Sequence, residues 1–188
     1  MKKIFFVALC LPLSLLATKV NAYEKFDYIP YIGVDYGFIN AKTAQAKNNY
    51  NLFNINIGTK YNNHFGTEAF FEQTDSDTKK ISDQLKLKTS YRAYGLDAMA
   101  YLPIGCYHEF DLFAGIGVAE YVFNKKFGKE KHRHQSGWGY RFGGGFIYNF
   151  NEKISLKAAA RYIELNDITD INHLYEYTFG LRYHFIKE

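Results

Sequence analysis

The chain has 188 residues, of which 47% are hydrophobic and 19% aromatic, and its formal net charge at pH 7 is +4. Seventeen Tyr and 17 Phe against only three Pro favour an all-β protein, and the length suits one domain. One of the two cysteines lies in the N-terminal segment described next, so Cys106 has no internal partner and a disulfide framework is excluded.

The first 22 residues have the features of a secretory signal peptide. Lys2 and Lys3 form a basic start, residues 4–16 are largely apolar, and a small-residue cleavage site ends at Ala22. The apolar run is too short for a membrane-spanning helix. We therefore predict cleavage after Ala22 and a mature domain of residues 23–188. Cleavage would remove three of the 23 basic residues, so the mature chain would carry 20 basic and 19 acidic residues. This near-neutral balance says little about partners, and we expect no nucleic-acid partner.

Eight stretches of the mature chain alternate apolar and polar residues with the period of two that marks a β-strand. These predicted strands cover residues 31–39, 49–61, 64–74, 88–102, 110–124, 137–149, 154–165 and 175–185. The fifth is the least regular, because Glu120 shares a face with Ile116 and Val118. Glu120 therefore either lies at a rim of the structure or marks a β-bulge.

The connections between these strands alternate in length. Those after the second, fourth and sixth strands are short, and the longer ones cover residues 41–48, 75–87, 125–136 and 166–173. Short turns on the periplasmic side and long loops outside are typical of outer-membrane barrels. The sequence thus predicts an eight-stranded antiparallel up-and-down transmembrane β-barrel with both termini in the periplasm.

Two observations indicate that the apolar face points outward, unlike that of a soluble lipocalin-type barrel. The glycines lie on the polar face, where they weaken a water-exposed strand but make room in a narrow lumen. The apolar face also carries more Phe and Tyr than an eight-stranded interior accommodates. Rings that face lipid need no such space, so a membrane barrel is favoured.

The polar face then becomes the lumen, where an unpaired charge is costly. It carries five acidic and five basic residues. These are Asp35, Glu68, Glu72, Asp97 and Glu176, against Lys60, Arg141, Lys157, Arg161 and Arg182. We expect them to pair in a salt-bridged plug that leaves no continuous pore.

Residues 178–185 read Thr-Phe-Gly-Leu-Arg-Tyr-His-Phe and resemble the closing-strand signal of bacterial outer-membrane barrels, with Gly180, Tyr183 and Phe185 at the signal positions. The whole stretch from residue 23 resembles the OmpA-like, opacity-type outer-membrane β-barrel family. Stretches of family type are Tyr31-Ile32-Gly33-Val34, Phe65-Gly66-Thr67-Glu68, residues 112–117 and Gly143-Gly144-Gly145.

This resemblance implies a location in the outer membrane of a Gram-negative bacterium and assembly there by the barrel-assembly machinery. Members of the family serve as envelope-structure proteins and as surface adhesins or immune targets. The implied partners are outer-membrane lipids, lipopolysaccharide and a host surface or matrix molecule, and a monomer is expected.

The strongest local feature is the basic loop after the fifth strand, which carries Lys125, Lys126, Lys129, Lys131 and Arg133 with a single Glu. Such a cluster suits lipopolysaccharide phosphates, a sulfated glycan or an acidic host protein. The alternative is a solvated loop that keeps the strand ends soluble.

An enzyme acting on lipid A would need a nucleophile, a base and an orienting acid within reach of one another. One candidate set consists of His173 as the base, Glu164 or Asp167 as the acid and Ser136 as the nucleophile. No spacing or motif supports this set. A lipid A-modifying enzyme or a narrow pore thus remain alternatives. We expect no catalytic residue, no cofactor and no metal site.

Overall fold

The computed structural model describes residues 28–43, 47–82, 85–104, 109–127, 131–166 and 171–185, so the predicted signal peptide and Cys106 lie outside the described residues. The strands are β1 (Ile29–Thr43), β2 (Lys47–Lys60), β3 (Phe65–Thr74), β4 (Asp77–Ser82), β5 (Leu85–Ile104), β6 (Phe110–Phe127), β7 (Lys131–Asn149), β8 (Ile154–Leu165) and β9 (Ile171–His184). Within these ranges no helix has the length and apolarity needed to cross a membrane.

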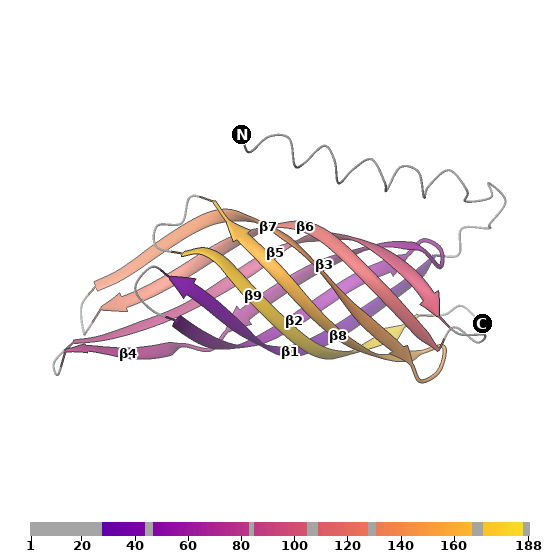
Figure 1. The fold of residues 1–188 in the computed structure, drawn as a ribbon, viewed down its shortest axis with the longest axis horizontal. Coiled ribbons are helices and arrows are strands. Elements are labelled where there is room, and N and C mark those ends of the chain that lie inside the picture. Colours follow the sequence, from indigo (N-terminus) through magenta and orange to yellow (C-terminus); the bar gives the residue numbers. More distant parts are fainter. Residues whose placement is uncertain are drawn as a thin grey trace.

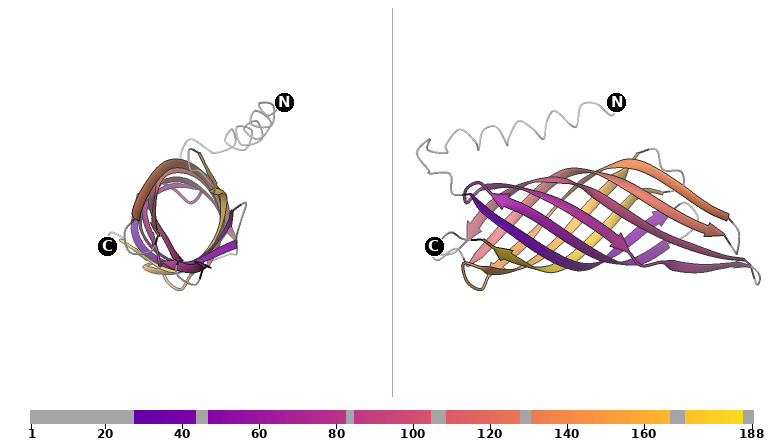
Figure 2. Two further views of the ribbon diagram at one scale, coloured as in Figure 1. Left: turned by 90° about the vertical axis from the view of Figure 1, so that its left-hand side faces the viewer. Right: turned by 180° about the vertical axis from the view of Figure 1, so that it is seen from behind.

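Antiparallel pairing closes eight of these strands into a ring. β1 pairs with both β2 and β9, and β3 pairs with β5 as well as with β2, so the sheet has no open edge along the barrel wall. Figure 2 shows the closed ring in its left panel. The predicted eight-stranded antiparallel up-and-down barrel is therefore confirmed.

The ninth strand, β4, is an addition to the predicted set. It lies outside the ring and pairs with the start of β5, in a segment that we expected to be loop. β6 and β7 likewise continue into the predicted loop 125–136, up to Phe127 and from Lys131. Figure 1 shows β4 and the adjoining strand ends projecting from one end of the barrel. Hairpin pairing satisfies the backbone there without apolar alternation, which is why the periodicity missed these extensions.

Short asparagine-capped turns close the opposite end. The Asn62 side chain accepts hydrogen bonds from the backbone N–H groups of His64 and Phe65, both at 2.8 Å, in the turn between β2 and β3. Asn151 does the same between β7 and β8 for Ile154, at 2.8 Å. Such side-chain-to-backbone bonds are the reason that Asn favours tight turns. In an outer-membrane barrel this end faces the periplasm, and the projecting strands face outside.

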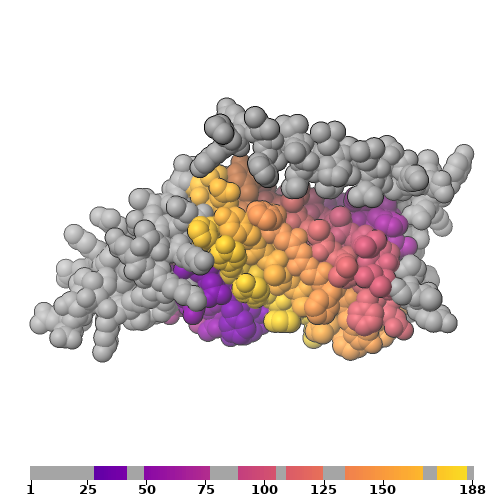
Figure 3. All heavy atoms as spheres, in the orientation of Figure 1, coloured from indigo at the N-terminus to yellow at the C-terminus, as the bar shows by residue number. Residues whose placement is uncertain are grey.

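The apolar side chains point away from the barrel axis, as predicted. Most of the large outward apolar residues are at least 42% exposed, which excludes the soluble alternative with an outer face of polar residues. They include Ile32, Val34, Tyr36 and Phe38 on β1, Phe53, Ile55 and Ile57 on β2, and Tyr177, Phe179, Leu181 and Tyr183 on β9. In Figure 3 the side chains of β8 and β9 form a continuous outer surface on the face shown.

Glu120 does not mark a bulge. The pairing of β6 with β5 and with β7 runs past Glu120 without a shift in register, so the bulge alternative is wrong. The Tyr94 hydroxyl donates a hydrogen bond of 2.5 Å to Glu120 Oε2 on the outer face. This carboxylate thus has a partner among the outward-facing side chains.

Candidate functional site

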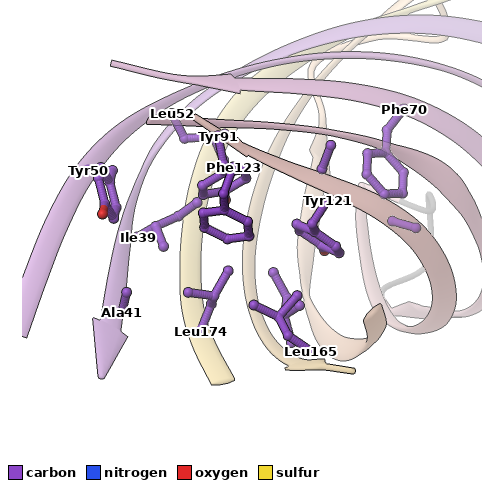
Figure 4. Close-up of a cluster of buried hydrophobic side chains, with 13 residues drawn as sticks. Ile39, Ala41, Tyr50, Leu52, Phe70, Tyr91, Tyr121, Phe123, Leu165 and Leu174 are labelled. Carbon is purple, nitrogen blue, oxygen red and sulfur yellow. The ribbon is translucent and has the colours of Figure 1, made fainter. Parts of the chain in front are cut away.

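The lumen has chemically different layers, two of which are large, and a smaller buried apolar cluster of Met99, Tyr101, Phe113, Ile147 and Ala159 lies nearer the periplasmic end. Toward the extracellular end the lumen is filled by an apolar cluster, which the sequence analysis did not anticipate. The apolar cluster comprises Ile39, Ala41, Tyr50, Leu52, Phe70, Tyr91, Ala93, Ala119, Tyr121, Phe123, Ile163, Leu165 and Leu174. Figure 4 shows these side chains converging inside the barrel from strands on opposite walls.

Aromatic rings form the centre of the apolar cluster. The Tyr91 ring centroid lies 5.1 Å from that of Phe123 and 5.8 Å from that of Tyr121, and all three side chains are fully buried. The sequence contains an indication of this apolar layer, because Ile39 and Leu52 continue the inward face of their strands past the last charged position. We had assigned that whole face to polar residues, and this part of the prediction was wrong.

Below the apolar cluster lies a charge network of nine of the ten predicted lumen residues. It comprises Asp35, Glu68, Glu72, Asp97, Arg141, Lys157, Arg161, Glu176 and Arg182. Arg141 is its first hub: its guanidinium lies 2.5 Å from Glu72, 3.3 Å from Asp97 and 3.7 Å from Glu176. It also stacks over the Phe70 ring at 3.8 Å, which joins the network to the apolar cluster.

Glu68 is the second hub and is fully buried. It accepts a hydrogen bond from Arg182 Nη2 at 2.5 Å, and its carboxylate lies 3.4 Å from Lys157 Nζ and 3.5 Å from Arg161 Nη2. The Tyr31 hydroxyl donates a further hydrogen bond of 3.0 Å. Three cations around one carboxylate compensate the cost of removing it from water.

Two residues connect these hubs to the remaining acids. Arg161 bonds Glu176 at 2.8 Å, so it joins the Arg141 group to the Glu68 group. Lys157 lies 2.6 Å from Asp35. Asn54 and Asn56 each donate a hydrogen bond of 2.9 Å to the same Asp35 carboxylate, a role that a search for charged residues alone does not find.

The tenth predicted residue, Lys60, pairs elsewhere. Its Nζ lies 2.9 Å from Asp111 at the periplasmic end of the lumen. Asp111 is 3% exposed and was missing from the predicted set, although it shares its strand face with Phe113. The lumen therefore holds six acids against five bases, and the equal count that we predicted is wrong. Nearby, His184 Nε2 and Ser155 Oγ lie 2.9 Å apart in a buried hydrogen bond.

Glycines make room for the charged side chains. Gly180 lies directly opposite Asp35, and a Cβ atom on Gly180 would overlap the Asp35 carboxylate. Gly117 stands in the same relation to Asp97. Gly180 thus has a packing role beside its predicted place in the assembly signal. The other two signal residues, Tyr183 and Phe185, point outward, with ring centroids 5.2 Å apart. The assembly role itself stays a prediction.

The predicted basic loop is mostly a regular hairpin, which we call the basic hairpin: Lys125 and Lys126 on β6, and Lys131 and Arg133 on β7. Lys125 is paired in register with Arg133, and Phe127 with Lys131. Lys129 lies outside the described residues. The expectation of an irregular loop was therefore wrong, and ligand binding by these residues remains a prediction.

Only some of the candidate catalytic residues for a lipid A-modifying enzyme lie near one another. Glu164 and His173 are directly opposite each other on β8 and β9, and His173 stacks on Tyr162 at 5.8 Å. Ser136 lies on β7, which does not pair with β9, the strand that carries His173. Asp167 lies outside the described residues. Among those described, no group of three or more His, Cys, Asp or Glu is arranged to hold a metal ion.

Comparison with known proteins agrees with this architecture. Neisserial surface protein A (NspA) superposes with a TM-score of 0.71 at 15% identity, over 83% of this chain and 97% of its own. Ail of Yersinia pestis, in complex with the heparin analogue sucrose octasulfate, gives 0.61 at 18% identity, over 85% and 99%. OprG of Pseudomonas aeruginosa gives 0.54 at 17% identity, over 86% and 97%.

At these identities the likeness to solved structures establishes the fold alone. The comparison with curated protein sequences finds no match. A family model for the outer membrane protein beta-barrel domain, however, matches residues 8–185, which is nearly the whole chain. Together with the closed ring and the outward-facing rings, this match shows that the chain belongs to the outer membrane protein beta-barrel domain family.

Proposed function

We propose that this protein supports the envelope as an outer-membrane barrel and binds a polyanion, of the sulfated-glycan class, at the cell surface. The proposed binding surface is the basic hairpin at the extracellular end. Such a molecule belongs to a host surface or matrix, so the proposed role is adhesin-like. We also expect lipopolysaccharide around the barrel, assembly by the barrel-assembly machinery, and a monomer.

The register of the basic hairpin carries this proposal. Lys125 is paired with Arg133, and the row from Lys88 on β5 passes through Lys126 to His132. Like charges directly opposite each other on neighbouring strands are destabilising. A multivalent anion bound along these rows would relieve that repulsion. The β1–β2 hairpin also opposes two bases, Lys42 and Lys47, but this pair is not continued into a row of bases on β9, where Lys42 faces His173.

A likeness in fold adds support. Ail, a barrel of similar fold, was solved in complex with the heparin analogue sucrose octasulfate. Binding is also favoured over lipid A chemistry, because Ser136 on β7 and His173 on β9 belong to strands that are not neighbours in the barrel.

The test is salt-dependent binding of heparin to cells that display the protein. Changing Lys125, Lys126, Lys129, Lys131 and Arg133 to Gln should weaken binding by about tenfold or more, since each base contributes to long-range attraction. The matched control changes Lys42 and Lys47, which are paired on the β1–β2 hairpin at the same end of the barrel. That control should bind almost as the unaltered protein does.

Equal loss in both variants would indicate general surface charge and would contradict a site on the basic hairpin. Unchanged binding in the five-residue variant would remove the proposal altogether. Mass spectra of lipid A from cells with and without the protein address the enzyme alternative. Identical spectra are expected, and a new acylation state that depends on Ser136 would favour catalysis.

A further inference from the structure

Four strand ends at the extracellular side pair into a small sheet that stands above the closed ring. In the described chain the β3–β5 pairing ends at Arg92 and the β7–β8 pairing ends at Gly139. Beyond these points β5, β6 and β7 stay paired with one another, and β4 pairs with the end of β5. Figure 1 shows these ends projecting from the barrel. We call them the projecting sheet, whose described residues are 77–82, 85–90, 124–127 and 131–136.

The alternation of each strand defines two faces of the projecting sheet. Thr89 and Tyr91 on β5 are buried on the lumen side, so the positions of Lys86 and Lys88 belong to the outer face. The register then assigns the positions on the other strands. The outer face carries Lys80, Lys86, Lys88, Lys126, His132 and His134. The inner face carries Lys79, Lys125, Lys131 and Arg133, together with Asp77.

The outer face gathers positive charge without an opposing carboxylate. Lys80 is directly opposite Lys86, and Lys88 is directly opposite Lys126. Like charges directly opposite each other on neighbouring strands are destabilising. Among the described positions of this face none is acidic, whereas the inner face has Asp77 beside its four bases. A bound polyanion would therefore relieve more repulsion on the outer face than on the inner one.

Two histidines on β7 extend the outer row of bases. His132 is directly opposite Lys126, and His134 is exposed and directly opposite Asn124. On its other side β7 has no paired strand at these positions within the described residues, so no carboxylate faces either position from a neighbouring strand. Imidazole changes its charge between about pH 5 and 8. A bound anion favours the charged imidazole, whereas Lys126 disfavours it in the free protein, so binding of the anion and of protons reinforce each other.

We propose that a sulfated glycan binds across the outer face of the projecting sheet, and that His132 and His134 strengthen this binding as the pH falls. This binding mode rests on the proposed polyanion function and narrows its site. Lys126 then acts together with three lysines of the β4–β5 hairpin. The bases of the inner face contribute only long-range attraction. Sulfate groups stay ionised throughout this pH range, so only the charge of the protein changes.

The first experiment measures heparin binding by the folded protein in phosphatidylcholine nanodiscs, which contain no lipopolysaccharide. Two variants each replace four bases by Gln: Lys80, Lys86, Lys88 and Lys126 on the outer face, or Lys79, Lys125, Lys131 and Arg133 on the inner face. Both lose the same formal charge from the same two hairpins, so their long-range attraction falls equally. The outer-face variant should bind heparin about tenfold more weakly than the inner-face variant.

Three outcomes would contradict this assignment in different ways. Equal losses in the two variants, or a larger loss in the inner-face variant, would overturn the outer face as the site but leave polyanion binding in place. Loss in neither variant would remove the proposed function itself. Complete displacement of heparin by lipopolysaccharide added to the nanodiscs would assign the outer face to membrane phosphates and overturn the proposal.

The second experiment compares heparin binding at pH 5.5 and pH 7.5. The unaltered protein should bind about fivefold more tightly at pH 5.5, because two positions of the face gain charge. The double variant His132→Gln, His134→Gln should bind equally at both pH values and should match the unaltered protein at pH 7.5. A pH-independent affinity in the unaltered protein, or the same pH dependence in the double variant, would overturn the role of the histidines. Unheated gel migration identifies the variants that are folded.

Discussion

The apolar cluster and the charge network fill the same lumen from the same face of the same strands, but they close it in different ways. The apolar cluster packs rings and branched side chains, such as Tyr91 and Phe123, against one another. The charge network places carboxylates and cations at 2.5–3.7 Å, and hubs such as Arg141 and Glu68 are each held by several partners. Strand alternation fixes the direction of a side chain, and its chemistry decides which kind of closure results.

The difference has an energetic consequence. Apolar packing tolerates exchange among side chains of similar volume, because no specific partner is lost. A buried ion pair does not, because removing one member leaves the other charged and without compensation. We therefore expect the charge network to be far more sensitive to a single substitution than the apolar cluster.

The largest effect is expected for Lys157→Met, which keeps the length of the side chain but removes its charge. Asp35 would lose the cation 2.6 Å away, and Glu68 would lose one of its three. The free energy of unfolding should fall by about 3–5 kcal/mol. Urea unfolding in lipid vesicles measures it, with the fluorescence of Trp138, the single tryptophan, as the probe.

The control for this substitution is Glu152→Gln, which removes a charge from the exposed turn between β7 and β8. It should leave the unfolding midpoint almost unchanged. If Lys157→Met and Glu152→Gln had the same free energy of unfolding, loss of a charge from the network would cost no more than loss of a charge from the surface, which would contradict the prediction.

An intermediate effect is expected for Gly180→Ala. The added Cβ would meet the Asp35 carboxylate and the Val34 carbonyl oxygen, so the free energy of unfolding should fall by about 1–3 kcal/mol. Protein refolded without the assembly machinery separates this packing cost from any defect in assembly.

A double-mutant cycle with Asp35→Ala isolates the contact with the carboxylate. Part of the cost of Gly180→Ala should vanish in that background, because the carboxylate that it meets is gone. If Gly180→Ala were equally destabilising with and without Asp35→Ala, its cost would come from the contact with the backbone and not from the contact with the charge network.

The smallest effect is expected in the apolar cluster, for Leu174→Met. Leu174 is fully buried, but its neighbours in register, Ile163 and Ala41, are apolar. The free energy of unfolding should fall by less than about 1.5 kcal/mol. Urea unfolding in lipid vesicles measures this change as well. A decrease in the free energy of unfolding as large as that of Lys157→Met would contradict the expected difference between the apolar cluster and the charge network.

The outward direction of the apolar face also needed the glycine positions and the number of aromatic rings, whereas residue alternation by itself determined the eight strands of the ring and the common face of all ten predicted charges. These properties follow from a period of two and from the cost of burying charge, and both can be read along one strand at a time. Alternation did not predict the apolar inward residues Ile39 and Leu52, nor β4 and the basic hairpin, whose sequences do not alternate apolar and polar residues.

Tertiary structure alone decided which charges meet. Glu68 on β3 contacts Arg182 on β9, 114 positions along the chain, and Arg161 joins two groups that no sequence spacing connects. Asp111 on β6 forms an ion pair with Lys60 on β2 at the periplasmic end of the lumen. Each of these depends on the register and closure of the barrel, because only closure brings side chains from opposite walls within bonding distance.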